Sequence, residues 1–370
     1  MARALSLARR GRGWTSPNPM VGAVLVRNGR LVAEGWHRHW GADHAEVDAL
    51  RKVDFKADQC DMYVTLEPCV HQGVTPPCVE AIIRAGVRTV HVAMIDPNPL
   101  VSGKGVRKLR QAGLGVEVGV LEREARELNE IFVKFITTGR PFVVAKAALS
   151  LDGRIATASG DSGQKSGGLS GPEAHRYVHQ LRRDLDAILV GAGTVLADDP
   201  LLTCRLPGRT RQPLRIVLDG MGRAPLSAHV FDVSAAPTTV ATTLQSPKIW
   251  RENLIRMGVQ VWVYKSGRRR LKTAGEAAID PHELVAELGQ RKIASLLIEG
   301  GSKTHAAFME AGLIDRYDLI FAPRLIGGDG LPLFAGSGAR ALAEAPTVSR
   351  LSTRRLGKDI LVRAYPEGAN

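Results

Sequence analysis

The chain has 370 residues, which at about 100–200 residues per domain predicts two domains, or three at most, and excludes a single small module. Hydrophobic residues make up 44% and charged residues 24%, as in ordinary globular proteins, which argues against extensive disorder or a fibrous architecture. Fifty Lys and Arg against 37 Asp and Glu give a net charge of +13. Such a charge favours anionic partners: nucleic acid, acidic lipid or phosphorylated metabolites.

Four cysteines are too few for a disulfide scaffold, and a reducing compartment fits them best. The first ten residues contain dispersed arginines and no apolar core followed by a cleavage site, so they do not predict a secretory signal. No charge-free apolar run reaches the length of about 18 residues that a membrane span needs. The sequence therefore predicts a cytoplasmic protein without a membrane partner.

The first 138 residues alternate between helix-like and strand-like segments. A helix is predicted over residues 2–10, followed by strands over 21–26 and 31–33, which Asn28-Gly29 joins as a hairpin. The next predicted elements are a helix over 44–51, a strand over 62–65, a helix over 79–84 and a strand over 90–95. Helices between strands predict a covered, largely parallel sheet.

The segment Leu121–Thr137 has apolar residues at helical spacing, which predicts one helix. It ends at Thr138-Gly139-Arg140-Pro141, where Gly and Pro predict a helix stop and a domain boundary. Domains are therefore expected over residues 1–139 and 140–370. In the second domain the predicted strands are 142–147, 187–190, 214–218, 295–298 and segments around Leu319 and Leu361, with helices after 171–172 and over 306–311. Both domains are predicted to be α/β.

The strongest chemical signal lies in the first domain. His44 and Glu46 open a helix, Cys69 follows Pro68, and Cys78 opens the next helix. One His and two Cys are suitable ligands for tetrahedral Zn²⁺ and leave a fourth position for water, as in catalytic zinc sites. Glu46 is expected to move protons for that water without binding the metal.

The order His-x-Glu, then Pro-Cys, then Cys is typical of zinc nucleobase deaminases, in which an activated water attacks a ring carbon that carries an amine. Cys69 and Cys78 are nine residues apart, whereas nucleic-acid deaminases carry Pro-Cys-x-x-Cys. The loop between them is expected near the metal. Cys60 and Cys204 lack such neighbours and are assigned to packing.

Four motifs of this domain carry a resemblance to a known family: Thr15-Ser-Pro-Asn-Pro-Met-Val-Gly22, His44-Ala-Glu46, Glu67-Pro-Cys69 through Thr75-Pro-Pro-Cys78, and Asp96-Pro-Asn-Pro99. They resemble the deaminase half of bifunctional riboflavin biosynthesis proteins. The resemblance implies zinc ligands at His44, Cys69 and Cys78, a proton shuttle at Glu46, and substrate contacts at Asn18, His37, Asp96 and Asn98. Val74 stands where the family usually carries Arg or Lys, so this chain lacks at that position the cation that the resemblance implies for phosphate binding.

In the second domain, Lys146 lies at a predicted strand end. Arg182 and Arg205 suit a substrate phosphate, because a guanidinium fork pairs with phosphate oxygens bidentately. Gly300-Gly301 precedes a predicted helix, whose first N–H groups suit a cofactor phosphate, although the Gly-x-Gly-x-x-Gly fingerprint is absent.

Residues 140 to about 364 resemble the reductase half of the same family, which has a dihydrofolate-reductase-like fold and uses NADPH. The resemblance implies substrate contacts at Ser166, Arg182, Leu201, Arg205 and Glu299, cofactor contacts at Thr194, Asp198, Gly300 and Gly301, and a catalytic Lys146 beside the ribose. The loop 160–171 lacks the family's Trp. Counting back from Arg182 selects Ser166 as the substrate-binding serine, whereas counting forward from Asp152 selects Ser162.

The sequence thus predicts an α/β enzyme with a cytidine-deaminase-like zinc domain and a dihydrofolate-reductase-like domain. It would hydrolyse the 2-amino group of 2,5-diamino-6-ribosylamino-4(3H)-pyrimidinone 5′-phosphate and then reduce the ribosyl group to ribityl with NADPH. An anionic substrate and cofactor account for the positive charge without nucleic acid, and a homo-oligomer is expected. The alternatives are a tRNA or other nucleic-acid deaminase with an accessory α/β domain, and a regulatory or scaffold protein without activity.

Overall fold

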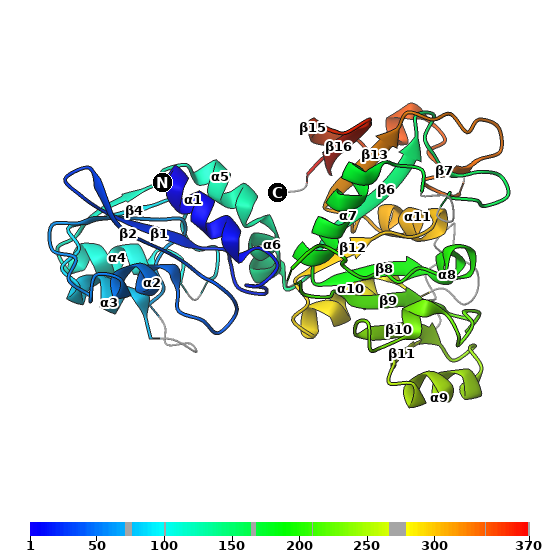
Figure 1. The fold of residues 1–370 in the computed structure, drawn as a ribbon, viewed down its shortest axis with the longest axis horizontal. Helices are drawn as coiled ribbons and strands as arrows, with labels where there is room; N and C mark the ends of the chain where they lie inside the picture. The colour runs from blue at the N-terminus through cyan, green and yellow to red at the C-terminus, as the bar shows by residue number, and fades with distance from the viewer. Residues whose placement is uncertain are drawn as a thin grey trace. The chain divides into compact units, whose positions relative to one another are not determined.

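A computed structural model describes residues 1–70, 76–99, 101–163, 168–208, 210–265, 279–336 and 338–368. The chain divides into two compact units, Met1–Arg140 and Pro141–Asn370 (Figure 1). Gly139 ends the last helix of the first unit in the left-handed conformation, with a φ of 68°, which glycine adopts without a steric penalty. Among the described residues, no helix is long and apolar enough to cross a membrane.

The first unit is built on a five-stranded sheet in the order β2-β1-β3-β4-β5. Its strands are β1 (Gly22–Arg27), β2 (Arg30–Trp36), β3 (Asp61–Val64), β4 (Thr89–Val92) and β5 (Gly115–Val118). β1 and β2 form the predicted hairpin, and Asn28 and Gly29 both have the positive φ that a tight hairpin turn requires. β3, β4 and β5 are parallel, whereas β1 runs antiparallel to β3, so the sheet is mixed.

Helices pack on both faces of this sheet (Figure 1). They are α1 (Ala2–Ala8), α2 (Ala45–Arg51), α3 (Cys78–Arg84), α4 (Lys104–Gln111), α5 (Glu122–Leu128) and α6 (Glu130–Thr138), with a 3-10 turn η1 (Arg9–Gly11) after α1. Side chains alternate along β1, so that Leu25 enters the larger core while Val24 packs against Leu7 of α1.

The single helix predicted over Leu121–Thr137 is wrong, because the chain breaks at Asn129 into α5 and α6. The Asn129 side chain is only 2% exposed and forms two hydrogen bonds to the backbone of Met20. Its Oδ1 accepts from Met20 N–H at 2.8 Å, and its Nδ2 donates to the Met20 carbonyl at 2.9 Å. The break thus ties the end of the first unit to the segment that leads into β1.

The second unit is built on a nine-stranded sheet in the order β11-β10-β9-β8-β12-β6-β13-β16-β15. Its strands are β6 (Phe142–Ser150), β8 (Ala187–Gly191), β9 (Leu214–Leu218), β10 (Thr238–Thr243), β11 (Gln260–Tyr264), β12 (Ser295–Ile298), β13 (Arg316–Ala322), β15 (Val348–Leu356) and β16 (Asp359–Pro366). The strands from β11 to β13 are parallel, and β16 and β15 add an antiparallel hairpin at the edge. β7 (Arg154–Ala156) and β14 (Leu331–Pro332) form a separate pair.

The two faces of this sheet have different helices and different chemistry. The helices are α7 (Pro172–Asp184), α8 (Ala192–Asp198), α9 (Lys248–Arg256), α10 (Pro281–Gln290) and α11 (Ser302–Glu310), with 3-10 turns η3 (His229–Phe231) and η4 (Leu342–Glu344). Val143 and Ala145 of β6 pack in the core with α10 and α11. Since side chains alternate along a strand, Lys146 points to the opposite face, which α7 covers (Figure 1).

We expect Asn129→Ala to lower the free energy of unfolding of the first unit by about 1–3 kcal/mol, because it leaves the Met20 N–H and carbonyl groups without their partner. The midpoint of urea unfolding, followed by circular dichroism, measures this change. Gln111→Ala, at the exposed end of α4, is the control that should leave the midpoint in place. An unchanged midpoint for Asn129→Ala would contradict the anchoring role of this side chain.

Candidate active sites

The first unit gathers its candidate residues at one edge of the sheet. β2 and β3 are both antiparallel to β1, so the end of β2, the end of β3 and the start of β1 lie at the same edge. β4 is parallel to β3 and ends there too. Asn18 precedes β1, His37 and His44 follow β2, Cys69 follows β3, and Asp96 and Asn98 follow β4.

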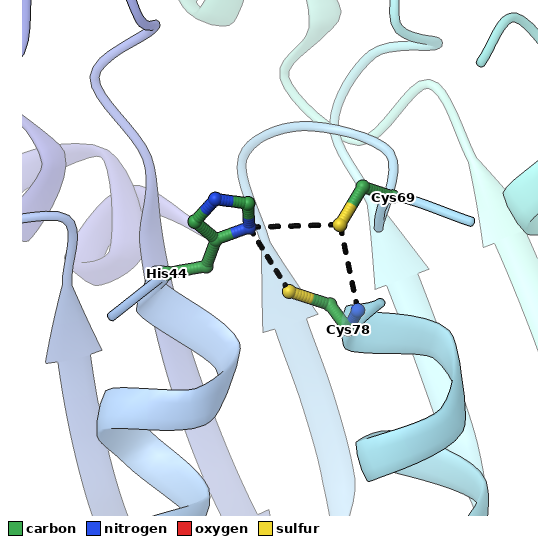
Figure 2. A group of neighbouring side chains, drawn as sticks. All are labelled: His44, Cys69 and Cys78. Carbon is green, nitrogen blue, oxygen red and sulfur yellow. Dashed lines mark hydrogen bonds between the residues drawn. The ribbon is translucent and has the colours of Figure 1, made fainter. Parts of the chain in front are cut away.

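His44 and Cys69, together with Cys78 at the start of α3, form a compact group of metal-binding side chains (Figure 2). The Nδ1 atom of His44 lies 3.2 Å from Cys78 Sγ and 3.6 Å from Cys69 Sγ, and the Cys78 backbone N–H donates to Cys69 Sγ at 3.4 Å. All three ligand atoms lie within 4.8 Å of one another. One imidazole and two thiol groups at this spacing fit Zn²⁺ and leave a fourth position for water.

The surroundings favour the thiolate form of one ligand. Hydrogen bonds from Cys78, and the nearby His44, lower the pKa of the Cys69 thiol to about 4, although burial opposes this shift. Cys78 is the first residue of α3, so its amide is one of the N–H groups that a helix start leaves without an intrahelical acceptor.

His44 is the N-cap of α2, and Glu46 lies two residues further on, in the first turn of the helix, where it is only 3% exposed. It does not belong to the group of three ligand atoms. Burial raises the pKa of its carboxyl group, although the positive charge of His44 opposes this shift. A buried carboxyl group beside a metal site is a candidate for accepting and releasing a proton.

His37 and Asn18 extend this site. The His37 Nδ1 atom lies 3.0 Å from the carbonyl of Asp43, which can only accept, so Nδ1 carries the hydrogen. His37 Nε2 is then the acceptor that faces Asn18 Nδ2 at 3.5 Å. The His37 ring also packs edge-to-face on His44, with 5.5 Å between ring centroids. Burial lowers the pKa of His37, which favours the neutral ring.

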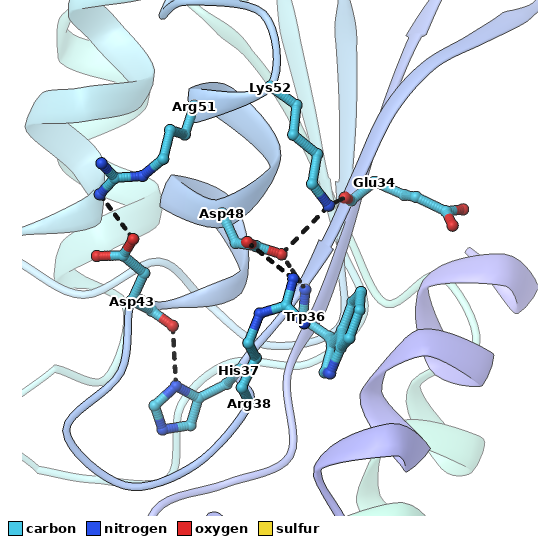
Figure 3. Close-up of polar contacts among 8 residues, drawn as sticks. All are labelled: Glu34, Trp36, His37, Arg38, Asp43, Asp48, Arg51 and Lys52. Atoms are coloured by element: carbon cyan, nitrogen blue, oxygen red, sulfur yellow. Dashed lines mark hydrogen bonds and ion pairs between the residues drawn. The ribbon is translucent and has the colours of Figure 1, made fainter.

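An ion-pair network that the sequence did not reveal fixes the loop between β2 and α2 (Figure 3). The Asp48 carboxylate accepts from the Trp36 backbone N–H at 3.2 Å and from Arg38 and Lys52 at 3.4 Å. Arg51 donates to Asp43 at 2.7 Å. These contacts hold both ends of the loop that presents His37 to the metal site.

Asp96 and Asn98 form a turn, in which Asp96 Oδ1 accepts from the Asn98 N–H at 2.9 Å. The Asp96 N–H in turn donates to the buried carboxylate of Glu67 at 3.2 Å. From the sequence, Glu67 is recognised only as the first residue of the Glu67-Pro-Cys69 motif, and no role is predicted for its side chain. Val74 lies outside the described residues.

In the second unit, Lys146, Arg182 and Glu299 form a buried charge cluster. Arg182 donates from Nε and Nη2 to the two oxygens of Glu299, both at 2.8 Å, and Lys146 Nζ lies 3.9 Å from Glu299. Burial opposes ionisation of Glu299, yet Arg182 and Lys146 hold its pKa at about 2. Burial lowers the pKa of Lys146, and Glu299 partly offsets this. The fork of Arg182 therefore faces Glu299, which leaves Arg205 as the better-placed guanidinium for a phosphate.

Arg205 and Leu201 lie in the loop that follows α8. Arg205 Nη1 donates to Thr203 Oγ1 at 3.2 Å, and its backbone N–H donates to His179 Nδ1 at 3.2 Å. Burial lowers the pKa of His179 to about 4, so its ring is neutral at pH 7. The Leu201 carbonyl accepts from the buried Arg215 at 3.1 Å. His179 and Arg215 were not predicted, since an isolated His or Arg carries no motif.

The candidate cofactor residues Thr194, Gly300 and Gly301 lie together. A Cβ on Gly300 would lie 2.9 Å from Thr194 Oγ1, so only glycine allows this approach, and Gly301 has a φ of +65°. The pair leads directly into α11, whose first N–H groups suit a phosphate. These features fit NADPH. Asp198 accepts from Ser162 Oγ at 2.8 Å, whereas Ser166 lies outside the described residues.

Comparison with known proteins gives each half of the chain a counterpart. Residues 1–94 match the cytidine and deoxycytidylate deaminase zinc-binding region, and residues 141–362 match the RibD C-terminal domain. The riboflavin biosynthesis protein RibD of Bacillus amyloliquefaciens is 41% identical over 368 residues, which cover 99% of this chain and 95% of that protein. The predicted fold class, a cytidine-deaminase-like domain followed by an α/β reductase domain, is confirmed.

Solved structures match over both units. The structure of Acinetobacter baumannii RibD is 38% identical, with a TM-score of 0.84, over 99% of this chain and 97% of that one. A diaminohydroxyphosphoribosylaminopyrimidine deaminase/5-amino-6-(5-phosphoribosylamino)uracil reductase from Thermotoga maritima is 35% identical, with a TM-score of 0.83 and the same coverage. The family that the sequence motifs resemble is thereby confirmed along almost the whole chain, which belongs to the RibD family of riboflavin biosynthesis proteins.

Proposed function

We propose that this chain carries out two consecutive steps of riboflavin biosynthesis. The first unit hydrolyses the 2-amino group of 2,5-diamino-6-ribosylamino-4(3H)-pyrimidinone 5′-phosphate, and the second reduces the ribosyl group to ribityl with NADPH. The observation that carries the proposal is the His44, Cys69 and Cys78 group beside the buried Glu46, in a chain that matches RibD proteins at both ends.

In the deaminase, His44, Cys69 and Cys78 would hold Zn²⁺, which when bound would activate a water molecule as a nucleophile at neutral pH. Glu46 would take a proton from the attacking water as its oxygen bonds to C2, and would pass a proton to the amine as the C2–N bond breaks. Ammonia would then leave, and the second proton of the water would stay on the ring. The position of Glu46, buried in the first turn of α2 next to the metal ligands, supports this role, because a general acid–base group must lie within reach of the proton it moves.

Four further side chains are proposed to hold the substrate. The Asn18 amide and the neutral His37 ring lie beside the metal group and suit the polar edge of the pyrimidine. Asp96 and Asn98, in the turn after β4, suit the hydroxyl groups of the ribose. Their arrangement at the same sheet edge supports contact with one substrate molecule.

In the reductase, Lys146, held by Glu299, is proposed to lie beside the ribose and to stabilise the negative charge that develops there during reduction. NADPH, when bound, would supply the hydride for C1′ of the substrate. Thr194, Asp198, Gly300 and Gly301 are proposed to bind the cofactor, and Arg205 the substrate phosphate, with Leu201, Arg182 and Ser166 or Ser162 as further contacts.

The alternative of a nucleic-acid deaminase with an accessory domain is not favoured, because relatives over nearly the full chain are RibD proteins. A cytoplasmic location, a homo-oligomeric assembly and the absence of nucleic-acid and membrane partners stay predictions. An assay of zinc content, ammonia release from the diaminopyrimidinone nucleotide and subsequent NADPH oxidation tests the whole proposal. Bound zinc without either reaction would support the inactive scaffold instead.

Glu46→Gln should retain zinc, because the side chain is not a ligand, but lower ammonia release by about 10²-fold or more, since general acid–base catalysis contributes about 10²–10⁴-fold. NADPH oxidation with the deaminated substrate should stay unchanged, which makes the second unit an internal control. Ammonia release at the original rate would refute the proton-transfer role of Glu46.

Lys146→Met keeps the length of the side chain and removes its charge. It should lower the kcat of NADPH oxidation by about 10²-fold, the effect typical of losing one charge-stabilising donor. Lys248→Met, on an exposed lysine of α9, is the matched control. Equal rates for Lys146→Met and the control would show that Lys146 takes no part in the reaction.

Glu299 also predicts a pH dependence of stability. A glutamate has an unfolded pKa of about 4.3, whereas here the folded pKa is about 2, so its stabilising contribution is present above pH 4.3 and is lost as pH falls toward 2. Glu299→Gln should therefore have a lower free energy of unfolding than the original protein at pH 7. This difference between the two proteins should become smaller between pH 4.5 and 2.5. The midpoints of urea unfolding at several pH values measure this difference. A difference that does not change with pH would contradict the lowered pKa of Glu299.

A further inference from the structure

The buried carboxylate of Glu67 has no part in the chemistry described above. Glu67 lies after β3, two residues before Cys69, and is only 3% exposed. Its Oε2 atom accepts the backbone N–H groups of Asp96 at 3.2 Å and Gly103 at 2.9 Å. Its Oε1 atom accepts the N–H of Val106 at 3.0 Å. One side chain thus collects three backbone donors from another part of the chain.

These three donors belong to two structures that adjoin the site. Asp96 opens the turn in which its own carboxylate accepts the Asn98 N–H at 2.9 Å. Gly103 is the N-cap of α4, and Val106 lies in its first turn. Glu67 therefore holds both the Asp96–Asn98 turn and the start of α4 against the segment that leads to the metal ligand Cys69.

The backbone of α4 comes unusually close to this segment. A Cβ on Gly105 would lie 2.2 Å from the carbonyl oxygen of Pro68 and 3.1 Å from Glu67 Oε1, so the contact requires glycine. Gly103 has a φ of 76°, which also favours glycine. The helix start, the turn and the Glu67-Pro68 segment form one closely packed unit, in which a small displacement of α4 would move the turn.

We propose that Glu67 is a positioning residue of the deaminase, which fixes the turn carrying Asp96 and Asn98 relative to the metal ligand Cys69. The substrate's ribose, held by the turn, is thereby placed so that the reacting ring carbon lies at the metal site. A carboxylate is required because all three partners are N–H donors, and glutamine offers only one acceptor oxygen. The inference rests on the proposed contacts of Asp96 and Asn98 with substrate.

Glu67→Gln keeps the size of the side chain but turns an NH₂ group toward a backbone N–H. In the zinc-loaded full chain, we expect the KM of deamination to rise about tenfold, with a smaller change in kcat, because displaced binding groups weaken substrate binding. Zinc content and NADPH oxidation with the deaminated substrate should stay unchanged. Gly105→Ala, which pushes α4 away from Pro68, should also raise the KM. It is the second test of the inference if Glu67→Gln fails to fold.

Glu80→Gln is the matched control, because Glu80 on α3 also reaches α4, through a surface ion pair with Lys108. It should leave the KM unchanged. If Glu67 acts through the turn, Glu67→Gln should add little to the KM of an Asp96→Ala/Asn98→Ala variant, so that the effects are not additive.

The outcomes separate the inference from the proposed function. An unchanged KM in Glu67→Gln and Gly105→Ala, with a raised KM in Asp96→Ala/Asn98→Ala, overturns the role of Glu67 alone. An unchanged KM in Asp96→Ala/Asn98→Ala refutes the proposed substrate contacts and the inference with them. Loss of zinc from Glu67→Gln with a normal KM for the zinc-loaded fraction would show a purely structural role.

Discussion

The direction of the strands decides where the chemistry of this chain can lie. In the first unit, β2, β3 and β4 share one direction, so the segments that follow them meet at a single sheet edge. That edge receives His44, Cys69 and Asp96 from segments far apart in sequence. In the second unit, β6, β8 and β12 are parallel neighbours, and Glu299 directly follows β12. The candidate residues of the first unit and Glu299 thus lie where the general rule for parallel strands places ligands, beyond the carboxyl ends. Lys146, predicted at a strand end, lies instead within β6, which continues to Ser150.

Burial of charge shapes the two sites differently. In the first, soft ligands can share one metal ion, and hydrogen bonds from Cys78, together with His44, lower the pKa of the Cys69 thiol, which favours a thiolate ligand. In the second, two cations lie in one buried region and need an anion between them, which Glu299 supplies. The guanidinium group of Arg182 is of a type that suits a phosphate, but it already forms a bidentate pair with the Glu299 carboxylate.

Several buried polar side chains stabilise the loops of both units by binding backbone groups rather than other side chains. Asn129 binds Met20, Glu67 binds the start of α4, and Arg215 binds the Leu201 loop. A buried backbone group without a partner is costly, so each such contact fixes a segment that regular secondary structure does not hold. Candidate substrate-binding residues lie on these segments: Asn18 near Met20, Asp96 beside the start of α4, and Leu201. The stability of these loops therefore affects the geometry of the candidate sites.

The sequence alone determined the α/β class, the hairpin at Asn28-Gly29 and the zinc chemistry, because hydrophobic period, turn residues and ligand types are local signals. The motifs also carried the family resemblance that the full-length relatives bear out. Tertiary structure decided what depends on distant partners. The break at Asn129, the pairing of Arg182 with Glu299 and the three N–H donors on Glu67 each join residues more than 20 positions apart. No local pattern encodes such pairs, since they exist only once the strands have brought their loops together.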